Sequence, residues 1–177
     1  MQSSPVVRGH STAKPVDWTS QIKRTSIALH KQSPTEVMNS LNERGCLSPN
    51  VWALRTQIEA SWESGQREIA YSNVRRLDFQ VDLRSWTWPV RQQVHHVAIE
   101  RGLGYCPLGA FMQQCLDGHP FNPNELRDAG LMAWMDPIKV NNKPMVLRLF
   151  NGVIRLEYCG PRSKIWPTDT LMFEVLG

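Results

Sequence analysis

Cys106 is the side chain in this chain of 177 residues whose position best suits covalent chemistry. It follows Gly104 and Tyr105 and precedes an apolar stretch with helical spacing, and the N-terminus of a helix stabilises a thiolate. A nucleophilic thiolate also needs an imidazole base from a distant part of the chain. The only later histidine, His119, is too close in sequence to face Cys106 from an opposing strand. The pattern therefore favours a buried cysteine over a nucleophile.

The basic residues near the N-terminus indicate a second kind of chemistry, the attraction of phosphate. Residues 1–33 hold five Lys and Arg side chains against Asp17 alone, whereas residues 34–177 hold 15 basic and 15 acidic side chains. The whole formal charge of +4 therefore lies in this basic segment. Its five basic residues are Arg8, Lys14, Lys23, Arg24 and Lys31.

The composition of residues 1–32, rich in Ser, Thr and Pro, predicts a flexible basic arm with one induced helix near residues 19–31. Such an arm would contact the phosphates of nucleic acid or of lipid. The alternative is a terminus that only keeps the chain soluble. Because the charge is concentrated here, we favour the phosphate-binding interpretation.

Trp86 and Trp88 stand together on either side of Thr87, just before Pro89. Aromatic rings in such a turn can stack on bases or anchor in a lipid interface. The same rings can instead form a corner that packs onto a sheet. The sequence leaves both interpretations open.

The Cys, His and Asp residues of the sequence do not have the spacing of metal ligands. The four cysteines contain no C-x-x-C pair, and zinc ligands usually have such short spacings. His95 and His96 are adjacent and cannot both face one ion from the same side of a helix. Asp78 and Asp82 share one face of a predicted strand without a third acidic partner. We expect reduced thiols, no metal and no cofactor; the cysteines are Cys46, Cys106, Cys115 and Cys159.

Several classes of protein are disfavoured by what the sequence lacks. Its apolar runs are far shorter than the roughly 20 residues of a spanning helix, and its first residues contain no apolar core of a secretory signal. Gly102-Leu103-Gly104 lacks the Gly-Lys-Ser/Thr ending of a phosphate loop and follows a predicted helix. No Ser-His-Asp, H-E-x-x-H or kinase signature is found. We therefore expect a protein that is not an enzyme.

Capping patterns predict the first helices. Ser33 and Glu36 form a capping box around Pro34, and Gly45 supplies the stop of that helix. Ser48 starts a second helix, which we expect to continue to about Gly65. Strict alternation over residues 77–84 then predicts a strand with one wet face. Three further helices are predicted to start at Pro89, Pro107 and Asn122, the last running towards Met132.

The C-terminal third is predicted to be β-structure. Two apolar strands, at residues 145–150 and 153–158, flank Asn151-Gly152, which is a strong signal for a hairpin turn. Residues 170–176 form a last candidate strand. This order of elements predicts an α+β domain at residues 33–177, with a small antiparallel sheet packed with several helices behind the arm of residues 1–32.

Residues 74–158 resemble the globular domain of rhabdovirus matrix proteins. The similarity runs through the alternating strand, through Trp86-Thr87-Trp88-Pro89 and the helix after it, and through Leu108-Gly109-Ala110-Phe111. It continues through the hairpin from Lys143 to Glu157, and Thr170-Leu171-Met172-Phe173-Glu174 resembles a late strand of the family. The family also places a basic arm before its α+β domain. The Pro-Pro-x-Tyr motif of members that infect animals is not found here.

This resemblance implies a matrix protein of the virion. Such a protein self-associates, condenses the viral nucleocapsid with its RNA, and acts at an anionic membrane surface as a peripheral protein. Its expected location is the virion, the host cytoplasm and the inner membrane surface. One alternative is a nucleic-acid-binding accessory protein or silencing suppressor that uses the arm with Trp86 and Trp88. The other is a cysteine peptidase, because Gly104-Tyr105-Cys106 resembles the nucleophile region of papain-like viral peptidases.

Overall fold

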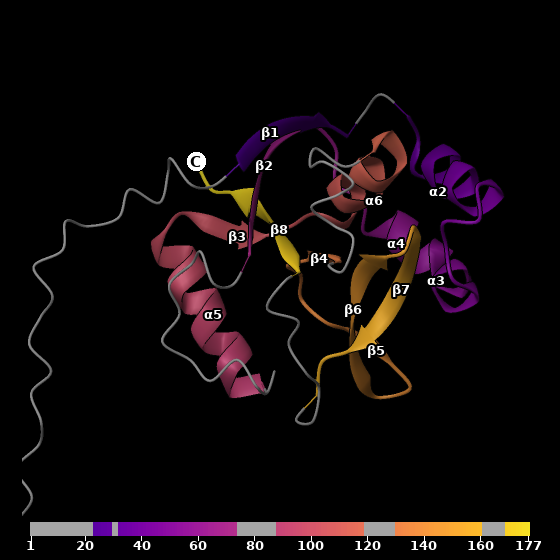
Figure 1. The fold of residues 1–177 in the computed structure, drawn as a ribbon. Helices are drawn as coiled ribbons and strands as arrows, with labels where there is room; N and C mark the ends of the chain where they lie inside the picture. The colour runs from indigo at the N-terminus through magenta and orange to yellow at the C-terminus, as the bar shows by residue number, and fades with distance from the viewer. Residues whose placement is uncertain (1–22, 30–31, 74–87, 119–129, 161–168) are drawn as a thin grey trace, which may run out of the picture.

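The computed structural model describes residues 23–29, 32–73, 88–118, 130–160 and 169–177 (Figure 1). These residues form five helices and an eight-stranded sheet. The helices are α2 (Pro34–Glu43), α3 (Pro49–Ala53), α4 (Arg55–Ala60), α5 (Trp88–Glu100) and α6 (Leu108–Asp117). The strands are β1 (Lys23–Ala28), β2 (Gln66–Asn73), β3 (Leu103–Tyr105), β4 (Leu131–Ala133), β5 (Ile138–Val140), β6 (Lys143–Phe150), β7 (Val153–Tyr158) and β8 (Thr170–Val175).

The predicted α+β class is confirmed, but the sheet is larger than expected and it is mixed. Its main path runs β1-β2-β8-β4-β6-β5, with β3 paired to β8 and β7 paired to β6. All of these pairs are antiparallel except β4 with β8, where Leu131 lies beside Thr170. Strands β3, β4 and β5 have only three residues each, which is too short for an alternating pattern to be visible in the sequence.

The N-terminal part of the prediction needs a correction. Residues 23–28 form strand β1 rather than part of a helix, and they pair with β2 from Lys23 opposite Tyr71 to Ala28 opposite Gln66. Ile27 and Leu29 are both buried, which is the two-residue period of a strand. The folded part of the chain therefore begins no later than residue 23, within the predicted arm of residues 1–32.

The local capping and turn signals are confirmed. Ser33 and Glu36 exchange both bonds of a capping box, at 2.8 and 3.2 Å, and Gly45 after α2 has a φ of 70°. The hairpin turn between β6 and β7 has positive φ at Asn151 and Gly152, at 50° and 75°. The second predicted helix is instead two short helices, α3 and α4, which meet at Leu54.

Other expected elements fall partly or wholly outside the described residues. The alternating strand at residues 77–84 and the start of the helix predicted from Asn122 both lie there. The expected end of that helix, Met132, lies in strand β4 and not in a helix. The helices predicted from Pro89 and Pro107 are confirmed as α5 and α6.

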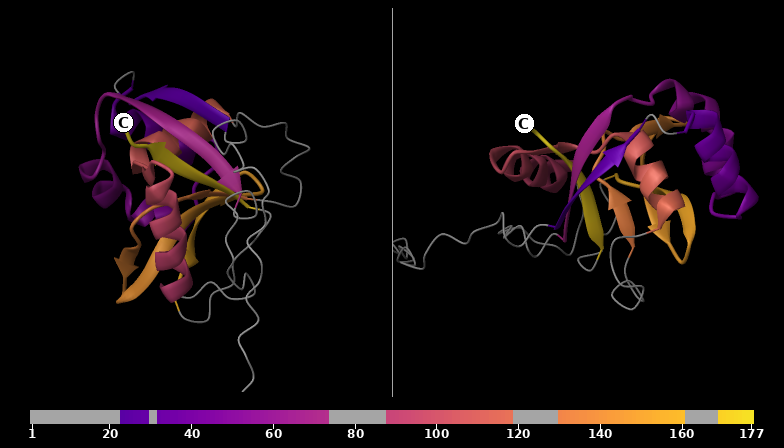
Figure 2. Two further views of the ribbon diagram at one scale, coloured as in Figure 1. Left: turned by 90° about the vertical axis from the view of Figure 1, so that its left-hand side faces the viewer. Right: turned by 90° about the horizontal axis from the view of Figure 1, so that it is seen from above.

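The helices lie in two places around the sheet (Figures 1 and 2). Helices α2, α4 and α6 pack on one another, and α6 also contacts β1. The approach of α6 to the segment just after α4 is close, because a Cβ on Gly109 would lie 2.7 Å from the ring of Trp62. Helix α5 lies apart from this group and packs against β3. None of these helices is both long enough and apolar enough to cross a lipid bilayer.

Candidate functional site

The structure describes two of the five predicted phosphate-binding residues. Arg24 lies in β1 and is exposed, and it forms an ion pair of 3.6 Å with Glu68 on β2. Exposed pairs of this kind contribute only about 0–1 kcal/mol, so Glu68 does not hold Arg24 firmly. Lys23 begins β1, although its side chain is outside the described part. The other three, Arg8, Lys14 and Lys31, lie outside the described residues.

Strand β1 carries these two basic residues at one end of the sheet. It is the first strand of the path β1-β2-β8-β4-β6-β5, and among the described residues β2 is the strand that pairs with it. Trp88, the predicted aromatic contact, is the first residue of α5, which packs against β3. Its side chain and the whole of Trp86 lie outside the described part of the chain.

Cys106 has the environment of a structural cysteine. Its side chain is buried, and its thiol donates to the carbonyl oxygen of Pro107 at 3.3 Å. Burial raises the pKa of the Cys106 thiol well above its usual value, with the charge of Glu174 adding to the effect. A nucleophilic cysteine needs the opposite shift, so this geometry argues against the peptidase alternative.

The His, Cys, Asp and Glu side chains of the described residues do not form a metal site. No group of three His, Cys, Asp or Glu side chains there is arranged to hold a metal ion. All four cysteines are free thiols. Asp78 and Asp82, the two carboxylates of the predicted strand, lie outside the described part.

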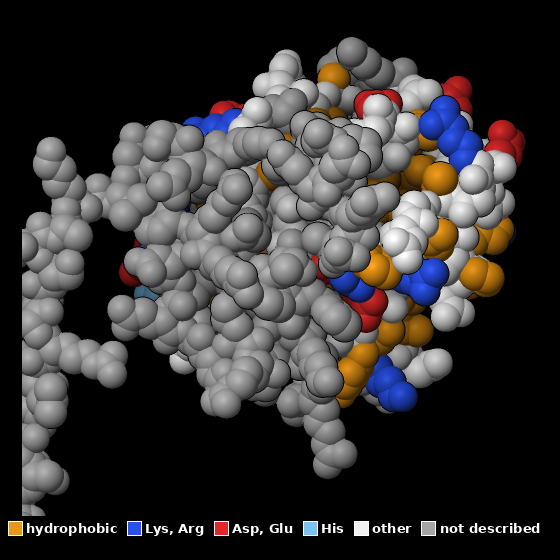
Figure 3. All heavy atoms as spheres, in the orientation of Figure 1, with side chains coloured by type: hydrophobic (Ala, Val, Ile, Leu, Met, Phe, Trp, Pro, Cys, Tyr) orange, Lys and Arg blue, Asp and Glu red, His pale blue; other side chains and the backbone are white. Residues whose placement is uncertain are grey.

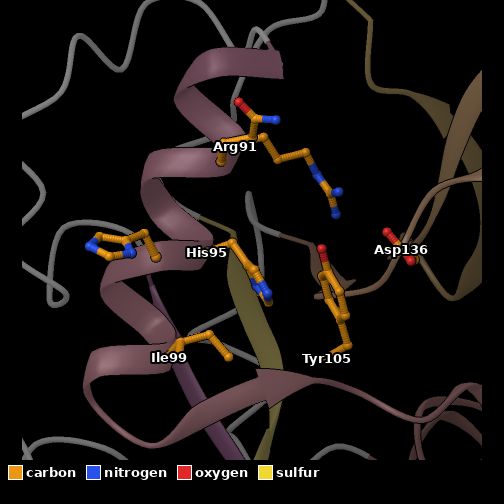
Figure 4. Close-up of a pocket in the computed structure, with 7 residues that line it drawn as sticks. Arg91, His95, Ile99, Tyr105 and Asp136 are labelled. Atoms are coloured by element: carbon orange, nitrogen blue, oxygen red, sulfur yellow. The ribbon is translucent and has the colours of Figure 1, made fainter.

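A pocket with no clear signal in the sequence lies between α5, β3 and the residues after β4 (Figure 4). Its volume is about 360 Å³, and its wall includes Arg91, His95, Ile99, Tyr105 and Asp136. Arg91, His95 and Ile99 are spaced four residues apart along α5, which places them on one helical face. We call this site the α5 pocket.

Arg91 is a buried cation in the wall of the α5 pocket. It is 3% exposed, its Nη2 donates to the carbonyl oxygen of Met135, and its guanidinium lies 4.7 Å from the ring centre of Trp134. Within the described residues its Nε has no hydrogen-bond partner, and no carboxylate forms an ion pair with it. Burial lowers the pKa of Arg91, yet a guanidinium stays charged in proteins.

The ring of His95 forms an aromatic stack in the same wall. It lies nearly parallel to the ring of Tyr105, with centroids 4.1 Å apart and planes 10° apart. Its Nδ1 accepts a hydrogen bond of 2.9 Å from the indole Nε1 of Trp134. An acceptor Nδ1 requires the neutral imidazole with its proton on Nε2, so this bond assigns the tautomer of His95.

Tyr105 and Asp136 complete the polar part of the α5 pocket. The hydroxyl of Tyr105 points into the space between the guanidinium of Arg91 and the carboxylate of Asp136 (Figure 4). Burial raises the pKa of Tyr105, and the charge of Asp136 and a side-chain hydrogen bond to Asp136 raise it further, so the hydroxyl keeps its proton and donates a hydrogen bond to that carboxylate. Asp136 itself is exposed to solvent. The pocket therefore offers donors on its inner side and an acceptor at its rim.

His95 should make the stability of the protein depend on pH. Burial lowers its pKa, Arg91 lowers it further, and Asp136 opposes them only in part. Because the unfolded chain binds this proton more readily, stability is expected to fall as the pH drops below about 6.5 towards the lowered pKa of the folded state. His95→Asn, which keeps an acceptor for Trp134, should reduce this loss when urea unfolding is compared above and below this range.

His96→Asn is the matched control, because His96 is the next residue of α5 and is exposed. Its pH dependence should follow that of the unmodified protein. An equal loss of stability on acidification in the His95→Asn variant and in the unmodified protein would show that His95 does not cause it.

Comparison with known proteins does not place this chain in a family. No protein-family model, curated protein or solved structure matches it. The resemblance of residues 74–158 to rhabdovirus matrix proteins therefore stays a prediction from the sequence. Of the segments that carry it, the hairpin, α5, α6 and β8 lie at least in part within the described structure.

Proposed function

We propose that this protein is a viral matrix protein that self-associates, condenses the ribonucleoprotein and links it to the inner face of the envelope membrane. One observation carries the proposal: the net charge of +4 lies entirely in residues 1–33, while residues 34–177 are neutral overall. In the fold, Lys23 and Arg24 of this basic segment lie in β1, at one end of the sheet. The resemblance of residues 74–158 supports the same function.

The membrane affinity expected of the basic segment suits a protein that binds in many copies. Each Lys or Arg near an anionic membrane contributes about 1 kcal/mol, and the attraction falls off within a Debye length of about 8 Å at physiological salt. Five basic residues with one acidic residue therefore attach a single copy only weakly. Many copies held in one assembly bind strongly through multivalency.

Residues 34–177, which we call the neutral body, have no net charge, and this suits close packing of identical copies. A large net charge of one sign would make neighbouring copies repel each other. Figure 3 shows basic, acidic and apolar side chains interspersed over the described part of the visible face. The described surface there therefore has no extended field of one sign to oppose assembly.

Binding of the full-length protein to vesicles and to RNA tests the proposal. We expect binding to phosphatidylcholine vesicles that contain phosphatidylserine, little binding to pure phosphatidylcholine, and a steep fall as salt is raised. Single-stranded RNA should compete with the anionic vesicles, because both are recognised through phosphate. Binding to RNA with no binding to the anionic vesicles would favour the nucleic-acid accessory protein instead. If the protein binds neither, the matrix proposal fails.

A further inference from the structure

Arg91 in the α5 pocket has fewer partners than a buried guanidinium needs. A guanidinium carries five N–H donors, and burying a cation is unfavourable unless these are hydrogen-bonded or the charge is paired. Among the described residues, Arg91 has one hydrogen bond, to the carbonyl of Met135, and one contact with the ring of Trp134. Neither partner carries a negative charge. An oxyanion from a ligand would supply both the charge and the acceptor atoms.

The inner wall holds two further donors near the Arg91 guanidinium, the imidazole of His95 and the hydroxyl of Tyr105, and the hydroxyl is hydrogen-bonded to Asp136 in this structure. The hydroxyl of Tyr105 points towards the space in front of the Arg91 guanidinium (Figure 4). His95 lines the same pocket, and its neutral imidazole carries its proton on Nε2 because Nδ1 accepts from Trp134. Charge-assisted bonds from Arg to an oxyanion are among the stronger hydrogen bonds in proteins.

Asp136 restricts which anions fit. Its carboxylate lies across the pocket from Arg91, beyond the hydroxyl of Tyr105 (Figure 4), and would repel a ligand that carries negative charge alone. A protonated amine next to the oxyanion would turn this repulsion into an attraction. The volume of about 360 Å³ lies in the range of small-molecule sites, which is roughly 300–1,000 Å³.

We propose that the α5 pocket binds a small zwitterionic ligand whose primary ammonium group is held by Asp136 and whose oxyanion is held by Arg91 and by Tyr105. The ammonium group takes the place of the Tyr105 hydroxyl at Asp136, and this hydroxyl then donates to the oxyanion instead. This chemistry is shared by free phosphorylated amino alcohols and by lipid headgroups that carry a primary amine. The proposal goes beyond the matrix function and does not depend on the basic segment, because the pocket residues lie on α5, β3 and the residues after β4.

Titration of O-phosphoethanolamine into the full-length protein, followed by calorimetry, tests the site. This ligand should bind more tightly than inorganic phosphate, which lacks the amine, and than phosphocholine, whose quaternary nitrogen has no N–H for Asp136. Tyr105→Phe keeps the ring that stacks on His95 and should weaken binding about tenfold. Asp136→Asn should remove the preference for phosphoethanolamine over phosphate.

Arg91→Gln should abolish binding of phosphoethanolamine. Because Arg91 is buried and its loss also disturbs the packing around it, the test rests on the two milder variants, Tyr105→Phe and Asp136→Asn. Arg155→Gln on β7 is the matched control, because Arg155 is exposed and lies outside the pocket lining. It should bind phosphoethanolamine as tightly as the unmodified protein. Absence of binding, or binding that neither of the milder variants changes, would overturn the proposal.

Vesicles identify the source of the ligand. Phosphatidylethanolamine and phosphatidylcholine are both neutral overall, so the basic segment does not distinguish them. Stronger binding to phosphatidylethanolamine vesicles that Tyr105→Phe removes would assign the pocket to a lipid headgroup, and binding of soluble phosphoethanolamine alone would assign it to a free ligand. Neutralising the basic segment should leave phosphoethanolamine binding unchanged, so failure of the matrix proposal and failure of this one are separable.

Discussion

Replacing the five basic residues of the basic segment with glutamine is expected to weaken binding to phosphatidylserine-containing vesicles by on the order of a thousandfold. Each lost charge removes about 1 kcal/mol of attraction near the membrane, and about 1.4 kcal/mol is tenfold in affinity. The measurement is vesicle co-sedimentation at fixed low salt. The substituted residues are Arg8, Lys14, Lys23, Arg24 and Lys31.

Glutamine substitution is preferable to truncation because of where β1 lies. Deleting residues 1–32 would remove β1 and with it a strand that pairs with β2. Deleting only residues 1–22 would remove Arg8 and Lys14 together with Asp17, a net charge of only +1. Substitution neutralises all five positions and keeps the strand.

A matched variant with substitutions in the neutral body tests whether vesicle binding depends on where the positive charge lies or only on the total net charge. It replaces five exposed basic residues outside the basic segment with glutamine, so both variants fall from +4 to a formal net charge of −1. The control should keep most of the vesicle binding. Equal losses in the two variants would mean that total charge, and not the basic segment, drives attachment. The control residues are Arg44, Arg55, Lys139, Lys143 and Arg155.

Asp169→Asn is expected to lower the free energy of unfolding by about 3–5 kcal/mol. The Asp169 carboxylate accepts from Arg148 at 2.6 Å (Nε to Oδ2) and at 3.0 Å (Nη2 to Oδ1), and both side chains are buried. Oδ1 also accepts from the backbone N–H of Gly130 at 2.7 Å. Removing the charge leaves the buried Arg148 without its main counter-ion, which is far more unfavourable than losing a surface pair. Urea unfolding measures the effect.

Glu157→Gln provides the comparison for this ion pair. Glu157 contacts the same Arg148 at 3.5 Å, but its side chain is 37% exposed. Its loss should lower stability by no more than about 1 kcal/mol. Similar effects of the two variants would show that burial does not set the strength of this network.

The parts of the fold that can be predicted from the sequence are those set by neighbouring residues. The capping box of Ser33 and Glu36 and the Asn151-Gly152 turn act over three residues or fewer, and both are found. Strand β2 has no such signal, because the run Ile69-Ala70-Tyr71-Ser72 is buried throughout and no alternation marks it. A strand buried on both faces cannot be recognised by its period alone.

The two candidate sites show the same difference between features set by neighbouring residues and features set by distant ones. The basic segment follows from counting charges, although the position of Lys23 and Arg24 in a strand depends on pairing with β2, about 45 residues away. The α5 pocket cannot be predicted in this manner, because Arg91, Tyr105 and Asp136 come from separate elements that only the folded sheet brings together. Its local signal is the four-residue spacing of Arg91, His95 and Ile99 along α5.

Sedimentation velocity of the full-length protein over a range of concentrations, with and without phosphatidylserine-containing vesicles, tests both self-association and membrane attachment in one experiment. A self-assembling matrix protein should sediment faster as its concentration rises, and it should move with the vesicles at concentrations where the five-glutamine variant does not. A protein that stays monomeric at every concentration and remains free of the vesicles would contradict the matrix function.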